Sequence, residues 1–322
     1  MAGPPAGLGV SKPRAAGVRR PYAAVPERVR AWVEETLGSP VASTAEQVGG
    51  MSPGCATRLV CADGTRAFVK AVGPELNVMT PELFRHEIAV LGVVGEDPLW
   101  APLLASYDEP GGWVALLLGD VEGRHPDMTD AGDVATVLAA VDRFVDTLAG
   151  RGVGHADTLG TLDRSIGRYA TMWPHLGDVP DDLLPPWARD RVEEMQARVP
   201  ELIARSTGDH VVNYDIRNDN LLLRPDGDVV FVDWGMARVG AAWLDPFVAR
   251  LEWADQPVFD DLVVGSPALR DLGDSAVTTF LYLLGAWLAY RTATDHSGPP
   301  GLAEFRVVES RRFLEAARRR LD

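Results

Sequence analysis

Two short stretches in the second half of the chain decide its fold, NYDIRNDN at residues 213–220 and VDWG at residues 232–235. In the first stretch Asn220 follows Asp215 by five residues, and in the second Asp233 directly follows a short apolar run. Apolar residues on both sides of a Pro-Asp-Gly-Asp turn connect the two stretches and predict a short hairpin. The sequence thus predicts two carboxylates and one carboxamide in loops beside a hairpin.

These residue types in this order are the ones that magnesium-dependent phosphoryl transfer uses. One carboxylate accepts the proton of the substrate hydroxyl, while an asparagine carbonyl and a second carboxylate hold the metal that bridges the phosphates. A single aspartate in a loop, by contrast, is most often a turn or cap residue. The pattern therefore predicts a kinase only if the other parts of a nucleotide site occur elsewhere in the chain.

A lysine in the first third of the chain suits the role of a phosphate clamp. The chain has only two lysines, Lys12 and Lys70, among 31 basic residues. Lys70 lies in the apolar stretch AFVKAV, where a charged side chain is unfavourable unless it has a function. A lysine ammonium is compact and binds phosphate as a point charge, which would be such a function. Glu87 lies in the predicted helix that follows, and such a lysine–glutamate pair positions an ammonium over nucleotide phosphates. Taken alone, Lys70 is equally well a strand lysine that extends to solvent, and Glu87 a solvated helix residue.

A glycine-rich loop, GGMSPG at residues 49–54, lies between two predicted strands. Within it Gly50, Ser52 and Gly54 allow backbone N–H groups to approach phosphate oxygens closely. The loop is not a Walker motif, since the chain contains no GxxxxGK[ST] and no complete GxGxxG. Because glycine-rich hairpins are common, the loop supports a nucleotide site only together with Lys70.

With these landmarks in this order, the chain resembles the aminoglycoside phosphotransferase and related small-molecule kinase family, which shares the protein-kinase fold. The resemblance covers nearly all of the chain after the first forty residues. It implies that Asp215 is the catalytic base, that Asn220 and Asp233 bind Mg²⁺, and that Lys70 is a phosphate clamp anchored by Glu87. It also implies ATP or GTP as the phosphate donor.

Three features bear on how closely the chain follows the family. Asn213 lies two residues before Asp215, where the family has a histidine that makes structural hydrogen bonds, and a carboxamide also donates and accepts. Arg217 lies two residues after Asp215, where protein kinases have a lysine near the transferred phosphate, and we assign it to neutralising charge in the transition state. No APE pattern follows Asp233, which argues against a protein substrate.

Hydrophobic periodicity predicts a two-lobed α+β fold of the protein-kinase-like kind. Period-two patterns and turn residues predict a small antiparallel sheet of about five strands with one helix after the third. The expected strands are residues 41–48, 55–61, 66–72, 103–107 and 113–118, and the expected helix is residues 80–94. We expect residues 1–25 to form a flexible tail, residues 26–120 a nucleotide-binding lobe, and residues 121–322 a larger, mostly helical lobe for catalysis and acceptor binding.

The charge of the chain bears on its partners. Thirty-one basic and 46 acidic residues give a net charge of -15, which argues against nucleic acid and against anionic membrane surfaces. Residues 208–261 contain eleven acidic and four basic residues, and two Mg²⁺ ions would cancel only about four of these charges. The surplus predicts a cationic acceptor, with Asp245, Glu252 and Asp255 as candidate binding residues. Asp245 also matches a structural aspartate of the family, and an acidic surface kept for solubility is the plainer interpretation.

The sequence therefore predicts a phosphotransferase that acts on a hydroxyl of a small molecule, with an aminoglycoside or similar cationic antibiotic as the first choice of acceptor. A neutral sugar, an amino alcohol or another hydroxylated metabolite is the alternative, and a pseudokinase without turnover is the rival from another class. The longest apolar run, residues 277–290, is too short to span a bilayer, and two cysteines suit a reducing compartment. We expect a soluble, cytoplasmic protein.

Overall fold

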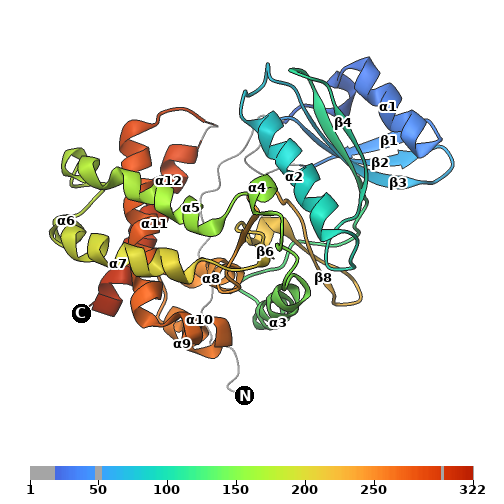
Figure 1. Cartoon of the computed structure of the whole chain (residues 1–322). Helices are drawn as coiled ribbons and strands as arrows, with labels where there is room; N and C mark the ends of the chain where they lie inside the picture. Colours follow the sequence, from blue (N-terminus) through green and yellow to red (C-terminus); the bar gives the residue numbers. More distant parts are fainter. Residues whose placement is uncertain (1–18, 48–52, 299–300, 322) are drawn as a thin grey trace. The chain divides into compact units, whose positions relative to one another are not determined.

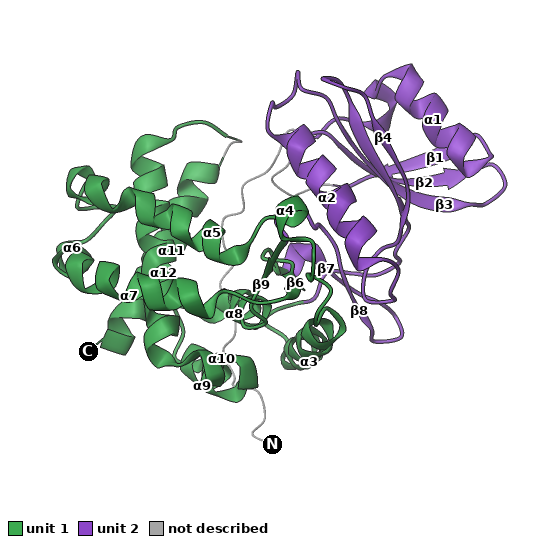
Figure 2. Ribbon diagram, viewed as in Figure 1, with its two compact units in different colours: residues 1–14, 127–217, 238–322 green, residues 15–126, 218–237 purple. Residues whose placement is uncertain are grey.

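The structure, a computed structural model, describes residues 19–47, 53–298 and 301–321. These residues form two compact units, which Figure 2 shows in different colours. Unit 1 contains residues 127–217 and 238–321, and unit 2 contains residues 19–126 and 218–237. The lobe boundary expected near residue 120 lies close to the end of the first segment of unit 2. The hairpin segment, expected in the C-terminal lobe, belongs instead to unit 2.

Unit 2 is built on a five-stranded antiparallel sheet with the strand order β1-β2-β3-β5-β4 (Figure 1). Its strands are β1 (Val41–Glu46), β2 (Cys55–Cys61), β3 (Arg66–Val72), β4 (Leu103–Asp108) and β5 (Val114–Gly119). A tight turn connects β2 and β3, and in it Gly64 has a φ of 89°, a left-handed conformation that glycine adopts without strain. The predicted sheet of five strands is confirmed.

Helix α1 (Glu27–Leu37) covers one face of this sheet. Val29 and Val33, one helical turn apart, are fully buried in the same hydrophobic cluster as Val69 and Ala71 of β3. Since successive side chains of a strand point to opposite faces, Lys70, which lies between these two residues, points to the other face. Packing of α1 therefore fixes the direction of the only lysine of the sheet.

Helix α2 (Thr80–Val94) follows β3 and contacts β4 and β5. The carboxamide oxygen of Asn77 accepts the N–H groups of Met79 at 2.8 Å and Thr80 at 3.0 Å just before the helix, and Thr80 is the first helical residue. Phe84, Glu87 and Leu91 are all buried, at the spacing of one helical face. A glutamate on a face that is otherwise apolar needs a partner, and the site provides one.

The hairpin segment of unit 2 consists of a 3-10 turn, η3 (Asn218–Asn220), and the strand pair β7 (Leu221–Leu223) and β8 (Val229–Phe231). Phe231 forms a β-bridge with Trp100, whose ring meets that of Trp234 edge-on at a centroid distance of 5.4 Å. These large apolar side chains are fully buried, and they attach the hairpin to a unit formed mainly by residues about a hundred positions earlier.

Residues 19–25, which the sequence analysis included in a flexible tail, are bound to the sheet. Arg19 forms a parallel β-bridge with Gly54, and the N–H of Arg20 donates to the carbonyl of Gly54 at 2.9 Å. Tyr22 and Val25 are buried in the cluster beneath α1. The tail predicted for residues 1–18 lies outside the described residues.

Unit 1 is mostly helical, as expected, with one short antiparallel strand pair, β6 (His210–Val212) and β9 (Arg238–Gly240). Its helices are α3 (Ala131–Thr147), α4 (Ala156–Leu159), α5 (Leu162–Tyr169), η2 (Ala170–Asp178), α6 (Pro186–Asp190), α7 (Val192–Arg205), α8 (Leu244–Arg250), η4 (Leu251–Trp253), α9 (Val258–Gly265), α10 (Pro267–Leu272), α11 (Asp274–Thr294) and α12 (Leu302–Leu321).

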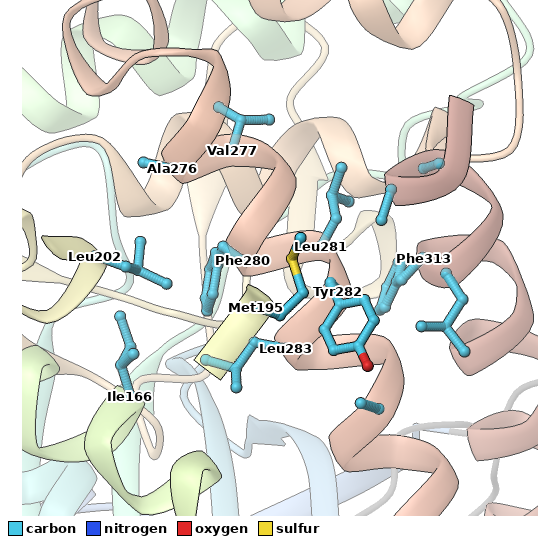
Figure 3. Close-up of a cluster of buried hydrophobic side chains, with 14 of the residues drawn as sticks. Ile166, Met195, Leu202, Ala276, Val277, Phe280, Leu281, Tyr282, Leu283 and Phe313 are labelled. Atoms are coloured by element: carbon cyan, nitrogen blue, oxygen red, sulfur yellow. The ribbon is translucent and has the colours of Figure 1, made fainter. Parts of the chain in front are cut away.

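Helix α11 forms the centre of the core of unit 1. It is apolar on nearly all sides, and Phe280, Leu281 and Leu283 are fully buried together with side chains of α7 and α12 (Figure 3). The buried hydroxyl of Tyr282 donates to the carbonyl of Ala188 at 2.6 Å, which satisfies its polar atom inside the core. Within the described part of the chain, no helix combines the length and the apolar character that crossing a membrane requires.

Candidate active site

A buried ion pair lies at the centre of the candidate nucleotide site of unit 2. The ammonium of Lys70 on β3 is 2.5 Å from Oε2 of Glu87 on α2, and the two side chains are only 11% and 2% exposed. The ring of Phe84, one turn before Glu87, lies under the ammonium at 5.0 Å from its centroid. The structure thus brings together the strand lysine and the helix glutamate that the sequence paired.

Asp233 joins this pair from the end of the hairpin segment. Its Oδ1 is 3.5 Å from the Lys70 ammonium, and the N–H of Trp234 donates to the other oxygen of Glu87 at 3.4 Å. Asp233 has a φ of 66°, which a residue other than glycine adopts only when its surroundings hold it there. A lysine, a glutamate and an aspartate from three separate elements therefore meet within one unit.

The charges of this cluster depend on one another. Burial disfavours the charged ammonium, but the carboxylates of Asp233 and Glu87 outweigh it and raise the pKa of Lys70 above its ordinary value. Burial raises the pKa of Glu87, and the ammonium of Lys70 opposes that rise. Lys70 therefore stays positively charged at neutral pH, as a group that binds phosphate must.

Asn220 lies at the other end of the same hairpin. It is buried, and its backbone carbonyl accepts the N–H of Val232 at 2.9 Å, so Asn220 and Asp233 leave the hairpin at the same open end. A carboxylate and a carboxamide oxygen are donors suited to Mg²⁺, which needs few protein ligands when phosphates supply others. Among the described residues, no cluster of three or more His, Cys, Asp or Glu suited to a metal occurs. The donors present fit Mg²⁺ bound together with a nucleotide.

Unit 1 carries the second half of the predicted machinery, the loop that contains Asp215. The buried carboxylate of Asp245 accepts the backbone N–H groups of Asn213 and Tyr214, each at 2.9 Å. The carboxamide oxygen of Asn213 then accepts the N–H of Asp215 at 3.0 Å. Tyr214 has a φ of 68°, and its hydroxyl lies 2.6 Å from that of Tyr169. Asp245 and Asn213 therefore hold the backbone that presents Asp215.

Asp245, a candidate acceptor residue, is buried and makes its hydrogen bonds to the backbone of the loop. It is 1% exposed, and burial raises its pKa to about 6, although the two N–H groups that it accepts oppose the shift. Asn213, in place of the histidine of the family, keeps a hydrogen bond to the loop. The departure at this position thus leaves the loop anchored.

Arg217 and Asp215 form an ion pair. Nη1 of Arg217 is 3.3 Å from Oδ1 of Asp215, and the side chains are 24% and 25% exposed. Both residues remain partly accessible, as groups that meet a substrate must.

The structure tests the glycine-rich loop only in part, because Gly50 and Ser52 lie outside the described residues. Gly54 is described, with a φ of 118°, and a Cβ added there would lie 2.6 Å from the carbonyl oxygen of Ala71. Its backbone conformation and this close approach both require glycine. Gly54 is thus needed for the start of β2, whatever role the rest of the loop has.

The structure gives the carboxylate of Asp255 a partner and places the backbone of Glu252 against the same arginine. The carboxylate of Asp255 is 2.9 Å from Nη2 of Arg312 on α12, and the same guanidinium donates to the backbone carbonyl of Glu252 at 2.6 Å. Asp260, which belongs to the same acidic segment, is paired with Arg320 of α12. The excess of acidic residues counted in residues 208–261 is therefore partly neutralised by arginines about sixty positions later in the chain.

Sequence reasoning missed two contacts that support the site. In unit 2, the imidazole Nε2 of His86 donates to the carbonyl of Ala237 at 2.7 Å and so connects α2 with the segment after Asp233. In unit 1, Tyr169 supports Tyr214 of the catalytic loop. Neither contact has a signal in the sequence beyond adjacency to Glu87 or Asp215, because the partners lie 151 and 45 residues apart in the chain.

Comparisons with solved structures show the fold. A thermostable mutant of aminoglycoside phosphotransferase APH(4)-Ia, in a ternary complex with ADP and hygromycin B, superposes with a TM-score of 0.63 at 14% identity, over 90% of this chain and 98% of that one. Choline kinase LicA from Streptococcus pneumoniae gives 0.58 at 13% identity, over 91% and 98%. An aminoglycoside phosphotransferase from Alicyclobacillus acidocaldarius gives 0.53 at 14% identity, over 86% and 91%.

A comparison with curated protein sequences gives no significant match. The model of the phosphotransferase enzyme family, by contrast, matches residues 59–304, which include Lys70, Glu87, Asp215, Asn220 and Asp233. This match spans more than two thirds of the chain and agrees with the fold and with the resemblance found in the sequence. The protein thus belongs to the phosphotransferase enzyme family and has the protein-kinase-like fold of the solved structures.

Proposed function

We propose that the protein transfers the γ-phosphoryl group of ATP or GTP to a hydroxyl of a small molecule, with Mg²⁺ as the metal. The observation that carries this proposal is the meeting of the buried pair Lys70 and Glu87 with the half-exposed carboxylate of Asp233, with Asn220 at the same end of the hairpin. Nucleotides in the complexes of related structures, ADP and AMP, support the identity of the donor.

In this mechanism unit 2 holds the donor. The ammonium of Lys70, fixed in direction by Glu87, donates hydrogen bonds to phosphate oxygens. Asn220 and Asp233 would hold Mg²⁺, which neutralises charge on the phosphates when it is bound. Because the cluster is largely buried, few waters compete for these contacts, and the electrostatic attraction is stronger than at an exposed surface.

Unit 1 supplies the base. Asp215 accepts the proton of the acceptor hydroxyl, the freed oxygen forms a bond to the γ-phosphorus, and the bond from phosphorus to the β–γ bridging oxygen breaks. The nucleoside diphosphate leaves with that electron pair, and Asp215 returns its proton to solvent. Arg217, paired with Asp215, is placed to neutralise charge that develops during transfer.

A pseudokinase would need only the residues that bind the nucleotide, whereas this chain also has the proposed base, Asp215. The side chains of Asp245 and Asn213 accept three backbone hydrogen bonds that order the loop of this base. A binding module has no use for a base that is held in this way. We therefore favour turnover over a silent fold.

For the acceptor we propose a small cationic molecule with a hydroxyl group. The net charge of -15 supports this choice, although the ion pairs of Asp255 and Asp260 with α12 remove part of the argument from the acidic segment. Related structures are named for an aminoglycoside and for choline, and both of these carry positive charge. A neutral sugar or other hydroxylated metabolite is the alternative.

A row of aromatic rings in unit 1 gives this choice a second support. The row starts at Tyr214, beside Asp215, and continues through Tyr169 to Trp287 at a centroid distance of 5.3 Å and to Tyr290 at 5.7 Å. All four side chains are only partly buried. Aromatic faces attract cations and also pack against sugar rings, and the guanidinium of Arg291 already lies over the ring of Trp287, 5.6 Å from its centroid. The row therefore fits an amino sugar or an amino alcohol at the ring faces that Arg291 leaves open.

The test is a screen for acceptor-dependent release of nucleoside diphosphate, run with aminoglycosides, amino alcohols and neutral polyols at several salt concentrations. A cationic acceptor should show a KM that rises with ionic strength, while the KM of the nucleotide changes less. If the best acceptor is uncharged and its KM is insensitive to salt, the proposal of a cationic acceptor is wrong and the metabolite kinase remains.

We also propose a cytoplasmic location, because the donor is abundant there and both cysteines are free, buried thiols.

A further inference from the structure

The N-terminal segment brings a second basic side chain to the nucleotide site. Arg19 forms a β-bridge with Gly54, the last residue of the glycine-rich loop, and the next residue donates its N–H to the carbonyl of Gly54 at 2.9 Å. The buried ring of Tyr22 and its N–H bond to Glu46, at 2.9 Å, anchor the segment a few residues later. The backbone position of Arg19 is therefore fixed from both sides.

Strand register decides the face to which Arg19 points. Cys55 of β2 is paired with Ala71 of β3, and a Cβ built on Gly54, one residue earlier, would lie 3.1 Å from the Cβ of Val72. Val72 lies two residues after Lys70 and shares its face. Because residues paired across a β-bridge project to the same face, the bridge directs the side chain of Arg19 toward the Lys70 face.

The electrostatics agree with this placement. Arg19 is half-buried, and burial lowers its pKa while the carboxylate of Asp233 acts in the opposite direction. Arg19 in turn disfavours the charge on Lys70. Two cations and two carboxylates, those of Glu87 and Asp233, therefore interact in one region, and without a metal their charges cancel. A divalent metal at Asp233 would leave the region positive and suited to a polyphosphate.

We propose that Arg19 is a second phosphate-binding cation of the donor site, one that contacts the terminal phosphates of the nucleotide. This inference rests on the proposed function and adds to it a residue outside the segment matched by the family model, which begins at residue 59. A guanidinium in this position offers two parallel N–H donors to phosphate oxygens, where Lys70 offers a point charge. The N-terminal segment would thus be part of the nucleotide site.

The experiment is calorimetric titration of the full chain with MgATP, MgADP and AMP. We expect Arg19→Ala to weaken MgATP binding about 10- to 100-fold, as expected for loss of a charged hydrogen bond, and to affect AMP much less. Arg19→Lys should recover part of the loss, and Arg19→Gln should not. The matched control is Arg20→Ala, because the bond from Arg20 to Gly54 uses only the backbone and survives the change.

Each other result decides against the inference. If Arg19→Ala binds MgATP as the wild type does, Arg19 does not contact the phosphates. If it binds more tightly, the guanidinium competes with the metal for Asp233 and inhibits binding. If Arg19→Ala weakens all three nucleotides equally, the residue only supports the fold of β2, and a lowered midpoint of thermal unfolding relative to Arg20→Ala would agree. If the wild type binds none of the three, the proposed function itself fails, and the inference falls with it.

Discussion

The buried pair of Lys70 and Glu87 makes a quantitative prediction about stability and function together. We consider Lys70→Met, Glu87→Gln and the double variant. In Lys70→Met, Glu87 keeps only the distant N–H of Trp234 and must bury an unpaired carboxylate or take up a proton. Breaking a buried pair from one side typically costs about 3–5 kcal/mol, and for Glu87, whose side chain is 2% exposed, we expect this full range.

The partner variant should cost less. In Glu87→Gln, the ammonium of Lys70 keeps the carboxylate of Asp233 at 3.5 Å, so we expect a loss near the lower end, about 3 kcal/mol. The double variant leaves a methionine beside a neutral glutamine, with no buried charge unpaired. We expect it to recover part of this loss and to lie about 1–3 kcal/mol below the wild type, because no buried charge is unpaired but the N–H groups of the buried carboxamide face a methionine.

The assay is urea unfolding of the four proteins, and in parallel their nucleotide turnover. A matched cycle at Arg85 and Asp108, which are 2.8 Å apart but 27% and 49% exposed, should give a coupling below about 1 kcal/mol. The double variant at the buried site should be stable and inactive, since it lacks the ammonium. If the coupling energy between Lys70 and Glu87 is as small as that between Arg85 and Asp108, the pair is not buried as described. If the stable double variant turns over nucleotide, Lys70 is not needed as a phosphate clamp.

Three further predictions concern the rest of the site. Asp215→Asn should lower turnover by about 10²–10⁴-fold and leave nucleotide affinity unchanged, as single-turnover kinetics and calorimetry can show; loss of nucleotide binding would mean that Asp215 is structural. Asp245→Asn should lower kcat about tenfold and spare nucleotide affinity, because each carboxylate oxygen of Asp245 accepts one N–H and the carboxamide replaces one of these oxygens with an NH2 group, which is a donor facing a donor. Because burial raises the pKa of Asp245 from 3.8 to about 6, the wild type should lose stability relative to this variant as the pH rises from about 4 to 6; a difference independent of pH would contradict the shift. Asp255→Asn should lower stability by about 1 kcal/mol through Arg312 and leave the acceptor KM within about twofold, whereas a large rise in KM would restore Asp255 as an acceptor residue.

The sequence was sufficient for the parts of the molecule that local patterns determine. Alternation and turn residues predicted all five strands of the sheet, and the rarity of lysine singled out Lys70. The pairing with Glu87 was predictable because a glutamate on the buried face of α2 needs a cation. These inferences hold because each depends on residues within one element or between neighbouring elements.

Other features could not be predicted, because they depend on residues far apart in the chain. Counting charges in a window of residues 208–261 overlooked Arg312 and Arg320, which lie on α12 and neutralise Asp255 and Asp260. The composition of the first 25 residues suggested a tail, yet the bridge of Arg19 to Gly54 forms through the backbone, which leaves no mark in the side-chain pattern. The hairpin segment joined unit 2 through large buried rings whose partners the local sequence does not reveal.

The central claim, phosphoryl transfer to a small hydroxylated molecule, is tested most directly by following the γ-phosphate itself. The measurement is transfer of label from γ-labelled ATP or GTP to an acceptor panel, with wild type and Asp233→Asn compared at equal concentration. The account predicts that the wild type moves label onto at least one hydroxylated small molecule and that Asp233→Asn does not. A wild type that binds MgATP and MgGTP but transfers label to no acceptor, or an Asp233→Asn variant that transfers it as fast, would contradict the account.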